Sequence, residues 1–439
     1  MARQALFAAH PTVGHTQALR AIGKALLSRG WGVRFALGHT PLVPRFLPTP
    51  EPLRAAAALP AALARDGFEV LRLPGSLRAL YHAARSVATR GYDELDHAVA
   101  LFTVDTQEAA RALLTAARTR PVDVFVADFA LFGAGIAAEV LGVPHAAVFH
   151  SGLPFPVEGA PPFGSGLAPT SDRALWAASA RRLAATEARA GARLGAARRA
   201  LGLAPGVPGG FSRPYATGLN ILTTFEALEL PRARLAEVAA GPLLWAGPCL
   251  GDRSGDAPAF PWKRLEPSAR WVYVSLGTVF NNQPAVFRAV LGAVHRAGAR
   301  AVVAAGASEE AVRRVADGDL VVRFAPQLEL LPRVVAMVGH GGNNSTNEAL
   351  RAGCPLLVVP FGAEQVANGQ RVQGLGVGEM VPPDALVPPG LDAALARVLD
   401  PATLERARAL ARSLPEGDGA VRAADAIEAL AQRSAAPAT

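Results

Sequence analysis

The stretch VGHGGNNSTNEALRAGCPLLVVPFGAEQ, residues 338–365, decides the fold. An apolar run leads into a glycine-rich turn, a helical pattern follows until Gly353 stops it, and a second apolar run ends in a polar loop. A turn that enters a helix N-terminus presents unpaired amide donors and the positive end of the helix dipole. The hydroxyls of Ser345 and Thr346 and the imidazole of His340 add further donors. The stretch therefore predicts an anion site built without a P-loop lysine.

The rest of the chain repeats this alternation of short apolar runs and helical patterns. In the first half, strands are predicted at residues 5–9, 33–37, 69–73, 122–127 and 146–149, and helices at 17–29, 133–141 and 174–203. After residue 267, strands are predicted at 271–275, 301–304, 320–323, 334–338 and 356–359, with a helix at 283–296. Residues 48–64, rich in Pro and Ala, read as loop with a short helix. Strands that alternate with helices predict parallel sheets.

The length of 439 residues is too great for one core and predicts two domains of about 200 residues each. We expect an α/β fold of two tandem Rossmann-like, doubly wound parallel-sheet domains that face each other across a cleft. The Gly/Pro/Asp-rich composition after Gly247 marks a linker. The expected organisation is a first domain at 1–240, a linker at 241–266, a second domain at 267–415, and a C-terminal helix and tail at 416–439 that pack back on the first domain.

Composition excludes several classes of function. The net charge of +8 comes from arginines scattered along helices, with few aromatic residues, so nucleic-acid binding is not expected. Cys249 and Cys354 are far apart and in no metal spacing, which favours two reduced thiols. No uncharged apolar run approaches the roughly 18 residues of a spanning helix, and the N-terminal run is too short for a signal peptide. We therefore expect a cytoplasmic protein with no transmembrane segment, either a monomer or a weak homodimer.

Two polar residues follow predicted strands in the first half. His15 opens the first helix and is a candidate general base, or else a histidine that is hydrogen-bonded locally. Asp128 ends a buried strand and is either the N-cap of the next helix or the partner that orients a catalytic imidazole. Gly14 stands alone rather than in a G-x-G-x-x-G fingerprint, so a nicotinamide or flavin cofactor is not expected.

Two further places lie past strands of the second half. The turn 275–278, which ends at Thr278, offers backbone amides and a hydroxyl to phosphate, or is an ordinary loop. Phe324 and Gln327 precede the opening stretch. Phe324 can stack on a flat base or be a core residue before a turn, and Gln327 can read an amide edge.

Together these places resemble the family-one nucleotide-sugar-dependent glycosyltransferases of GT-B fold, especially the bacterial macrolide and natural-product branch. The donor signature of that family is matched by His340-Gly341-Gly342, Asn344-Ser345-Thr346, Glu348-Ala349-Leu350, Gly353, Pro355, Pro360, Glu364-Gln365 and Asn368. Phe324-Ala325-Pro326-Gln327 is similar to the start of the signature, and Gly14-His15 is similar to the N-terminal catalytic histidine.

The resemblance implies that the domain at 1–240 binds the acceptor and that the domain at 267–415 binds the nucleotide-sugar. It also implies a role for each matching position. His15 would deprotonate the acceptor, and Asp128 would orient the imidazole of His15. The donor would be held by its base, ribose, diphosphate and sugar through Phe324, Gln327, Glu348, Thr278, His340, Gly342, Asn344, Ser345, Glu364 and Gln365. Acceptor contacts are expected from Leu80, His150 and Phe155.

The implied reaction is a single displacement with inversion at the anomeric carbon, which turns an α-linked glucose-type donor into a β-glycoside. No DxD-like acidic pair occurs in the stretch, so neither a metal nor a cofactor is expected. Phe324 replaces the usual Trp, Asn343 stands where apolar residues are common, and Glu364 takes the place of an Asp.

The leading hypothesis is an O-glycosyltransferase that moves a hexose, first of all glucose, from a UDP-sugar to a hydroxyl of an apolar small molecule such as a macrolide or flavonoid. A dTDP-deoxysugar-dependent antibiotic-tailoring enzyme is the alternative. A GT-B-fold sugar-nucleotide epimerase and a catalytically silent nucleotide-sugar-binding partner are further possibilities.

Overall fold

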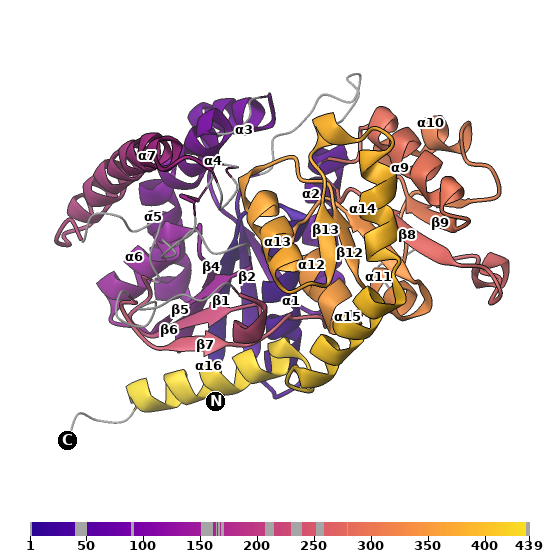
Figure 1. Cartoon of the computed structure of the whole chain (residues 1–439). Helices are drawn as coiled ribbons and strands as arrows, with labels where there is room; N and C mark the ends of the chain where they lie inside the picture. The colour runs from indigo at the N-terminus through magenta and orange to yellow at the C-terminus, as the bar shows by residue number, and fades with distance from the viewer. Residues whose placement is uncertain are drawn as a thin grey trace. The chain divides into compact units, whose positions relative to one another are not determined.

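The computed structural model of the chain describes residues 2–39, 51–88, 92–150, 161–163, 165, 167, 171–206, 215–229, 239–251, 259–278 and 280–435. The chain forms two compact units. The first comprises Met1–Gly251 and Gly417–Thr439, and the second comprises Asp252–Glu416 (Figure 1). Both are built on parallel sheets with helices, as the alternating pattern predicts.

The first unit holds a parallel sheet of seven strands in the order β3-β2-β1-β4-β5-β6-β7. The order reverses between β1 and β4, and the crevice beyond the carboxyl ends of such a pair is where open α/β sheets bind ligands. The strands are β1 (Gln4–Ala9), β2 (Gly32–Leu37), β3 (Glu69–Arg72), β4 (Val124–Asp128), β5 (His145–Phe149), β6 (Leu219–Leu222) and β7 (Leu243–Trp245).

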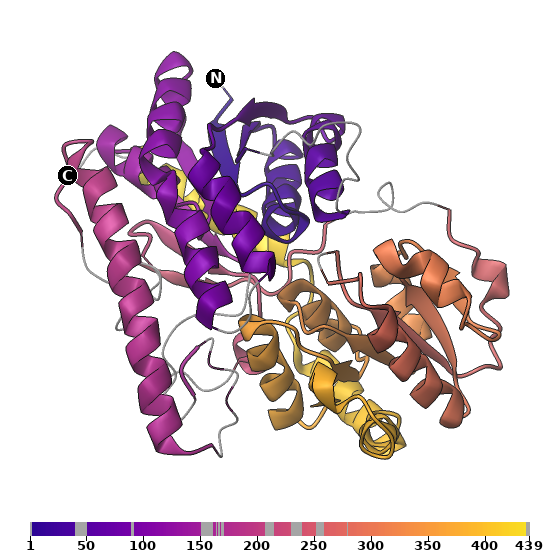
Figure 2. The same ribbon diagram turned by 90° about the horizontal axis from the view of Figure 1, so that it is seen from above.

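Helices cover both faces of this sheet because its central strands alternate apolar side chains up and down. Phe7 of β1 points to the face covered by α1, α2 and α16, whereas Leu6 points to the face covered by α5 and α6. The long helix α7 packs against α4 and α5 (Figure 2). The helices are α1 (Val13–Leu27), α2 (Glu51–Arg65), α3 (Leu77–Ala88), α4 (Tyr92–Val104), α5 (Thr106–Thr119), α6 (Phe132–Leu141), α7 (Arg173–Arg199) and α16 (Gly419–Ala435), with a 3-10 turn at Glu226–Leu228.

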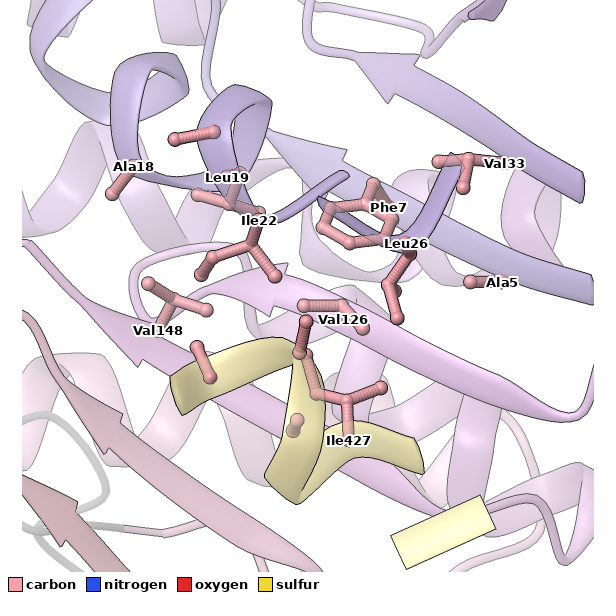
Figure 3. Packing of buried hydrophobic residues seen from close by; sticks show 14 of the residues in the cluster. Ala5, Phe7, Ala18, Leu19, Ile22, Leu26, Val33, Val126, Val148 and Ile427 are labelled. Atoms are coloured by element: carbon pink, nitrogen blue, oxygen red, sulfur yellow. The ribbon is translucent and has the colours of Figure 1, made fainter. Parts of the chain in front are cut away.

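The C-terminal helix α16 belongs to the core of the first unit, although it follows the whole second unit in sequence. Ile427 is fully buried against Ile22 of α1 and Val126 of β4 in one apolar cluster (Figure 3). Burying one such side chain contributes about 1.5–3 kcal/mol. Glu428 anchors the same helix, since it accepts hydrogen bonds from Arg29 at 2.7 Å and from the indole of Trp31 at 2.8 Å.

The second unit holds a six-stranded parallel sheet in the order β10-β9-β8-β11-β12-β13. Its order reverses between β8 and β11, the same relative place as in the first sheet. The strands are β8 (Trp271–Ser275), β9 (Arg300–Ala304), β10 (Leu320–Val322), β11 (Ala336–Gly339), β12 (Leu356–Val358) and β13 (Gly378–Met380). The helices are α9 (Pro284–Arg296), α10 (Glu309–Arg313), α11 (Gln327–Leu330), α12 (Asn343–Arg351), α13 (Ala363–Gly374), α14 (Gly390–Val398) and α15 (Pro401–Ser413), with 3-10 turns at Trp262–Arg264, Gly306–Ser308, Leu331–Arg333 and Pro383–Ala385.

Two local expectations were wrong. The first helix begins at Val13 rather than at residue 17, because Thr12 caps it with a side-chain hydrogen bond to the amide of His15. Residues 51–65 form a full 15-residue helix that tolerates Pro60, instead of a loop with a short helix. Among the described helices, none has both the length and the apolar character that crossing a bilayer requires.

Candidate active site

The first group of polar residues surrounds the point where the first sheet reverses its order. His15 lies in the first turn of α1, directly past β1, and Asp128 is the last residue of β4. Because these two strands are neighbours and parallel, their carboxyl ends meet and bring residues 113 positions apart into contact. The Nδ1 atom of His15 lies 2.5 Å from Oδ2 of Asp128. The His15 side chain is 20% exposed and the Asp128 side chain is fully buried.

Both carboxylate oxygens of Asp128 accept hydrogen bonds. Oδ2 accepts from Nδ1 of His15 and from the amide of His10, the latter at 3.3 Å. Oδ1 accepts from Nε2 of His150 and from the amide of Ala130, each at 3.0 Å. Asp128 does not cap α6, whose N-cap is Leu131 with no side-chain capping bond. Of the two sequence-based readings of this residue, the geometry matches the partner of an imidazole.

The electrostatics keep this carboxylate ionised. Desolvation alone would raise the pKa of Asp128, but the charges of His15 and His150 and their hydrogen bonds outweigh it and hold the pKa well below the usual range. An ionised carboxylate only accepts hydrogen bonds, so the ring nitrogen of each histidine that faces it must carry the proton. Neutral His15 is therefore the Nδ1–H tautomer, and its Nε2 keeps a lone pair.

His10 differs from His15 although both follow β1. Burial lowers the pKa of His10 to about 4, against the opposing charge of Asp128, so its ring is neutral at physiological pH. Its Nε2 lies 3.2 Å from the carbonyl oxygen of Ala130. Phe102 of α4 packs on both rings, with centroid distances of 4.8 Å to His10 and 5.4 Å to His15. The His10 ring thus contacts a backbone carbonyl, whereas the His15 ring contacts the carboxylate of Asp128.

One group of side chains in the described part of the chain has metal-ligand chemistry: His15, Asp128 and His150, whose ligand atoms lie within 4.8 Å of one another. Two of those nitrogens already donate to Asp128. A metal ion would have to displace both protons, so the arrangement fits a hydrogen-bonded proton relay better than a metal centre.

The second group lies where the second sheet reverses its order. Helix α12 begins at Asn343 directly past β11, and its N-cap Gly342 makes no side-chain capping bond. The first-turn amides of α12 thus receive no cap from a Gly342 side chain, and a helix N-terminus of this kind is a common anion-binding site. Gly341 has φ +83°, and a Cβ there would lie 2.9 Å from the carbonyl oxygen of Gln365. The turn needs glycine both for its left-handed backbone and for its close packing.

His340 is the residue before this glycine turn, and its ring packs against the turn. Burial lowers the pKa of His340 to about 4, although a backbone hydrogen bond of Ser275 raises it, so the ring is neutral at physiological pH. Gly277, just past β8, has φ +71°, and a Cβ there would lie 2.6 Å from Cε1 of His340. The two turns past β8 and β11 therefore interlock. Thr278 is partly exposed beside them, and its carbonyl accepts from the Asn281 amide at 3.4 Å.

The remaining predicted donor residues of this unit fall into two places. Gln327 begins α11 and donates from Nε2 to Oε2 of Glu348 at 2.6 Å and to Oγ of Ser345 at 3.2 Å. Glu348 is only 4% exposed, so it is not the exposed helix charge that its position in a helix implies by itself. The Phe324 ring is 38% exposed, too open for a core residue.

Glu364 and Gln365 lie in the first turn of α13, past β12. Glu364 is partly exposed, whereas Gln365 is buried and its Oε1 accepts from the amide of Phe361 at 2.7 Å. Asn344 is partly exposed in the first turn of α12. These residues all follow the carboxyl ends of strands of the second sheet.

The expected acceptor residues are spread out. Leu80 is 41% exposed on α3, with Leu77 and Tyr81 of the same helix exposed beside it. His150 is 4% exposed and bonded to Asp128. Phe155 lies outside the described residues.

Comparison with known proteins identifies the chain. Residues 288–416 match a family model described as "Erythromycin biosynthesis protein CIII-like, C-terminal domain". Glycosyltransferase GtfE of Amycolatopsis orientalis is 30% identical over 309 residues, which cover 68% of this chain and 71% of that protein. The chain belongs to the family-one GT-B natural-product glycosyltransferases.

Other known proteins are similar to the chain in sequence or in fold. NDP-glycosyltransferase YjiC of Bacillus subtilis is 32% identical over 196 residues, 44% of this chain. The chain spans about half the length of YjiC and of two further Bacillus relatives that it matches (49%, 50% and 47%). The structure of CalG4, the calicheamicin glycosyltransferase, is 22% identical with a TM-score of 0.73, and the match covers 99% of this chain and 100% of that one. The last comparison shows a shared GT-B fold.

Sequence reasoning missed the residues that support His15 and the turn before α12. Phe102 lies in a helix that its sequence alone gives no reason to place over His15. Arg371, only 5% exposed, donates to Oδ1 of Asn368, whose Nδ2 donates to the carbonyl of Gly341 at 2.6 Å. The buried arginine thereby positions Asn368, which holds the turn at Gly341. A charged residue at helical spacing from Asn368 was the available signal, but its burial cannot be read from the sequence.

Proposed function

We propose that the protein is an inverting, metal-independent O-glycosyltransferase that moves glucose from UDP-glucose to a hydroxyl of an apolar small-molecule natural product. One observation carries the proposal: the contact of 2.5 Å between Nδ1 of His15 and the buried carboxylate of Asp128. This contact leaves Nε2 of a partly exposed imidazole as a base. A neighbouring carboxylate stabilises the imidazolium that forms when such a base gains a proton.

The proposed reaction is a single displacement. Nε2 of His15 takes the proton of the acceptor hydroxyl while the acceptor oxygen bonds to the anomeric carbon. The bond from that carbon to the phosphate oxygen breaks, and the nucleoside diphosphate leaves with the electron pair. Attack opposite the leaving group inverts the configuration, so an α-linked donor gives a β-glycoside.

The turn past β11 supports the donor half of the proposal. The first-turn amides of α12 and the small Gly341-Gly342 turn offer donors to a diphosphate. Neutral His340 can donate one hydrogen bond without adding a charge that would hold the product. A helix end contributes on the order of 0.3–2 kcal/mol per charge, so several donors must act together. The pair Gln327–Glu348 offers acceptors to ribose hydroxyls.

The acceptor half is supported by apolar surface and by family. Leu77, Leu80 and Tyr81 expose an apolar strip on α3. YjiC is named an NDP-glycosyltransferase and the matching family model is named for erythromycin biosynthesis. We therefore propose a macrolide-like or flavonoid-like acceptor.

The test is a transfer assay with product detection by mass. The purified chain is incubated with UDP-glucose, UDP-galactose or dTDP-glucose against phenolic and macrolide acceptors, with and without EDTA. We expect a hexose adduct with UDP-glucose that EDTA leaves unchanged, and an anomeric proton with the coupling of a β-glycoside. Transfer only from dTDP-glucose would favour the dTDP-deoxysugar alternative. UDP binding with neither transfer nor donor hydrolysis would overturn the proposal.

A matched pair of variants assigns the base. His15→Ala should abolish transfer but retain UDP binding. The chain offers a control with the same chemistry: His295, whose Nε2 lies 2.9 Å from Oδ2 of the buried Asp319. This pair lies at the amino edge of the second sheet, since Asp319 precedes β10 and also accepts from the amide of Ala301 in β9. His295→Ala should leave transfer unchanged, and undiminished transfer by His15→Ala would remove His15 from the mechanism.

A further inference from the structure

A second histidine contacts the carboxylate that holds His15. His150 directly follows β5, and its Nε2 lies 3.0 Å from Oδ1 of Asp128, the oxygen that His15 does not use. The ring centroids of the two histidines are 4.3 Å apart. The His150 side chain is 4% exposed, compared with 20% for His15. His150 is therefore placed to act on Asp128 rather than on an acceptor.

The strand order explains this contact. β4 lies between β1 and β5 in the sheet, so the residue at the end of β4 has one neighbour from each side. His15 reaches Asp128 from the side of β1, and His150 reaches it from the side of β5. The carboxylate is held by an imidazole on each oxygen.

We propose that His150 is a positioning residue of the transfer reaction: its Nε2–H fixes one oxygen of Asp128 so that the other stays directed at Nδ1 of His15. The inference rests on the proposed function of His15 as the base. Without the bond from His150, Oδ1 keeps the amide of Ala130, which belongs to the same loop and constrains the carboxylate plane less. Rotation of that plane would release Nδ1 of His15 and allow the wrong tautomer.

The surroundings of the carboxylate leave His150 as its second side-chain donor among the described residues. His10 contributes its backbone amide, while its ring faces the carbonyl of Ala130. The nearby Tyr215 is partly buried, and desolvation together with the charge of Asp128 raises the pKa of its hydroxyl, so the hydroxyl stays neutral. The His150 ring also packs against Phe129 at 5.4 Å, so a purely steric role is the competing explanation.

Two substitutions separate positioning from bulk. His150→Gln places an amide N–H near the position of Nε2 but loses the ring, whereas His150→Leu keeps similar bulk and has no donor. Because His150→Leu removes a hydrogen bond to a charged group, we expect its kcat to fall by about 10–100-fold, with KM for UDP-glucose within about 2-fold. His150→Gln should recover most of the loss. The reverse pattern, with Leu active and Gln impaired, would overturn the proposal.

A spectroscopic measurement makes the test independent of transfer. In the ¹⁵N-histidine-labelled protein, His15 should give the Nδ1–H tautomer with a strongly hydrogen-bonded proton. That signal should be lost or exchange rapidly in His150→Leu and persist in His150→Gln. The control is His145→Gln, which removes an equally buried histidine from the start of the same strand, remote from Asp128. An unchanged His15 signal in His150→Leu would refute the positioning role, even if the wild-type protein proves to have no transferase activity.

Discussion

Both sheets reverse their strand order at the same relative place, between β1 and β4 in the first unit and between β8 and β11 in the second. In the first unit this place holds an ionised carboxylate between two imidazoles. In the second it holds glycines with positive φ, the N-terminus of helix α12 and a neutral histidine. Under the proposed function, the same architecture serves proton transfer in the first unit and anion binding in the second. Because the two units share their backbone geometry, the difference between the two sites comes from the side chains that follow the strands.

The largest expected effect breaks the first site and leaves the second intact. Asp128→Asn keeps the shape of the side chain but removes the charge that stabilises an imidazolium at His15. Its NH₂ group would also face a histidine N–H, so that two donors meet where a hydrogen bond was. We expect kcat to fall by about 10³–10⁴-fold. The affinity for UDP, measured by calorimetry, should stay within about 2-fold. The control is Asp123→Asn, directly before the same strand, where the carboxylate accepts a hydrogen bond from the amide of Gln4 at 2.6 Å. An equal loss of UDP affinity in Asp128→Asn would contradict the separation of roles.

The next effect compares the units in acid. Burial lowers the pKa of His10 and His145 in the first unit, and of His340 in the second, from 6.5 to about 4. Between pH 6.5 and pH 4 the unfolded chain therefore binds more protons than the folded one, and stability falls as the pH falls. Each histidine lowers the free energy of unfolding by about 3 kcal/mol over this pH range.

The check is urea unfolding at pH 7 and at pH 4.5. Glutamine does not titrate. On acidification, the free energy of unfolding of His145→Gln should therefore fall by about 2 kcal/mol less than that of the wild type. The unfolding transition of the first unit should therefore differ between variant and wild type in its response to acid. The transition of the second unit should respond equally in both proteins. Equal acid losses in the two proteins would show that His145 titrates normally when folded.

A third substitution breaks the second site. Gly341→Ala forces a Cβ into the left-handed region and against Gln365, at a cost of about 1–3 kcal/mol. Since the strain falls on the turn before α12, UDP affinity should drop by about 10-fold or more, while the His15 Nδ1–H signal is unchanged. Gly298 is the matched control: it also has positive φ, at +65°, but a Cβ added there would meet no atom within 4 Å. Gly298→Ala should destabilise the unit without weakening UDP binding; equal UDP affinity in both variants would argue against the turn as the diphosphate site.

The smallest effect sharpens the donor half. Phe324 is 38% exposed and offers a smaller face than the Trp usual at this position. If it stacks on the base, Phe324→Trp should tighten UDP binding by at most about 5-fold, within the range of aromatic pair energies. Phe324→Ala should weaken it by about 10-fold. Calorimetry that finds UDP affinity identical in all three proteins would exclude stacking.

Sequence reasoning predicted much of this fold because strand residues such as Phe7 and Val126 are buried in an uninterrupted apolar pattern. It failed where local patterns are short or ambiguous. β13 has three partly exposed residues and was not predicted. The start of α1 was misplaced because Thr12 as a cap is visible only once the helix is known to begin beside it.

The sequence by itself determined the two-sheet architecture and the turn before α12, since periodicity and glycine spacing are local properties. Only the tertiary structure decided which nitrogen of His15 faces Asp128, that His150 holds the other carboxylate oxygen, and that Glu348 is buried beside Gln327. These contacts join residues from different strands and helices. They depend on the order of strands in each sheet, which no local pattern records.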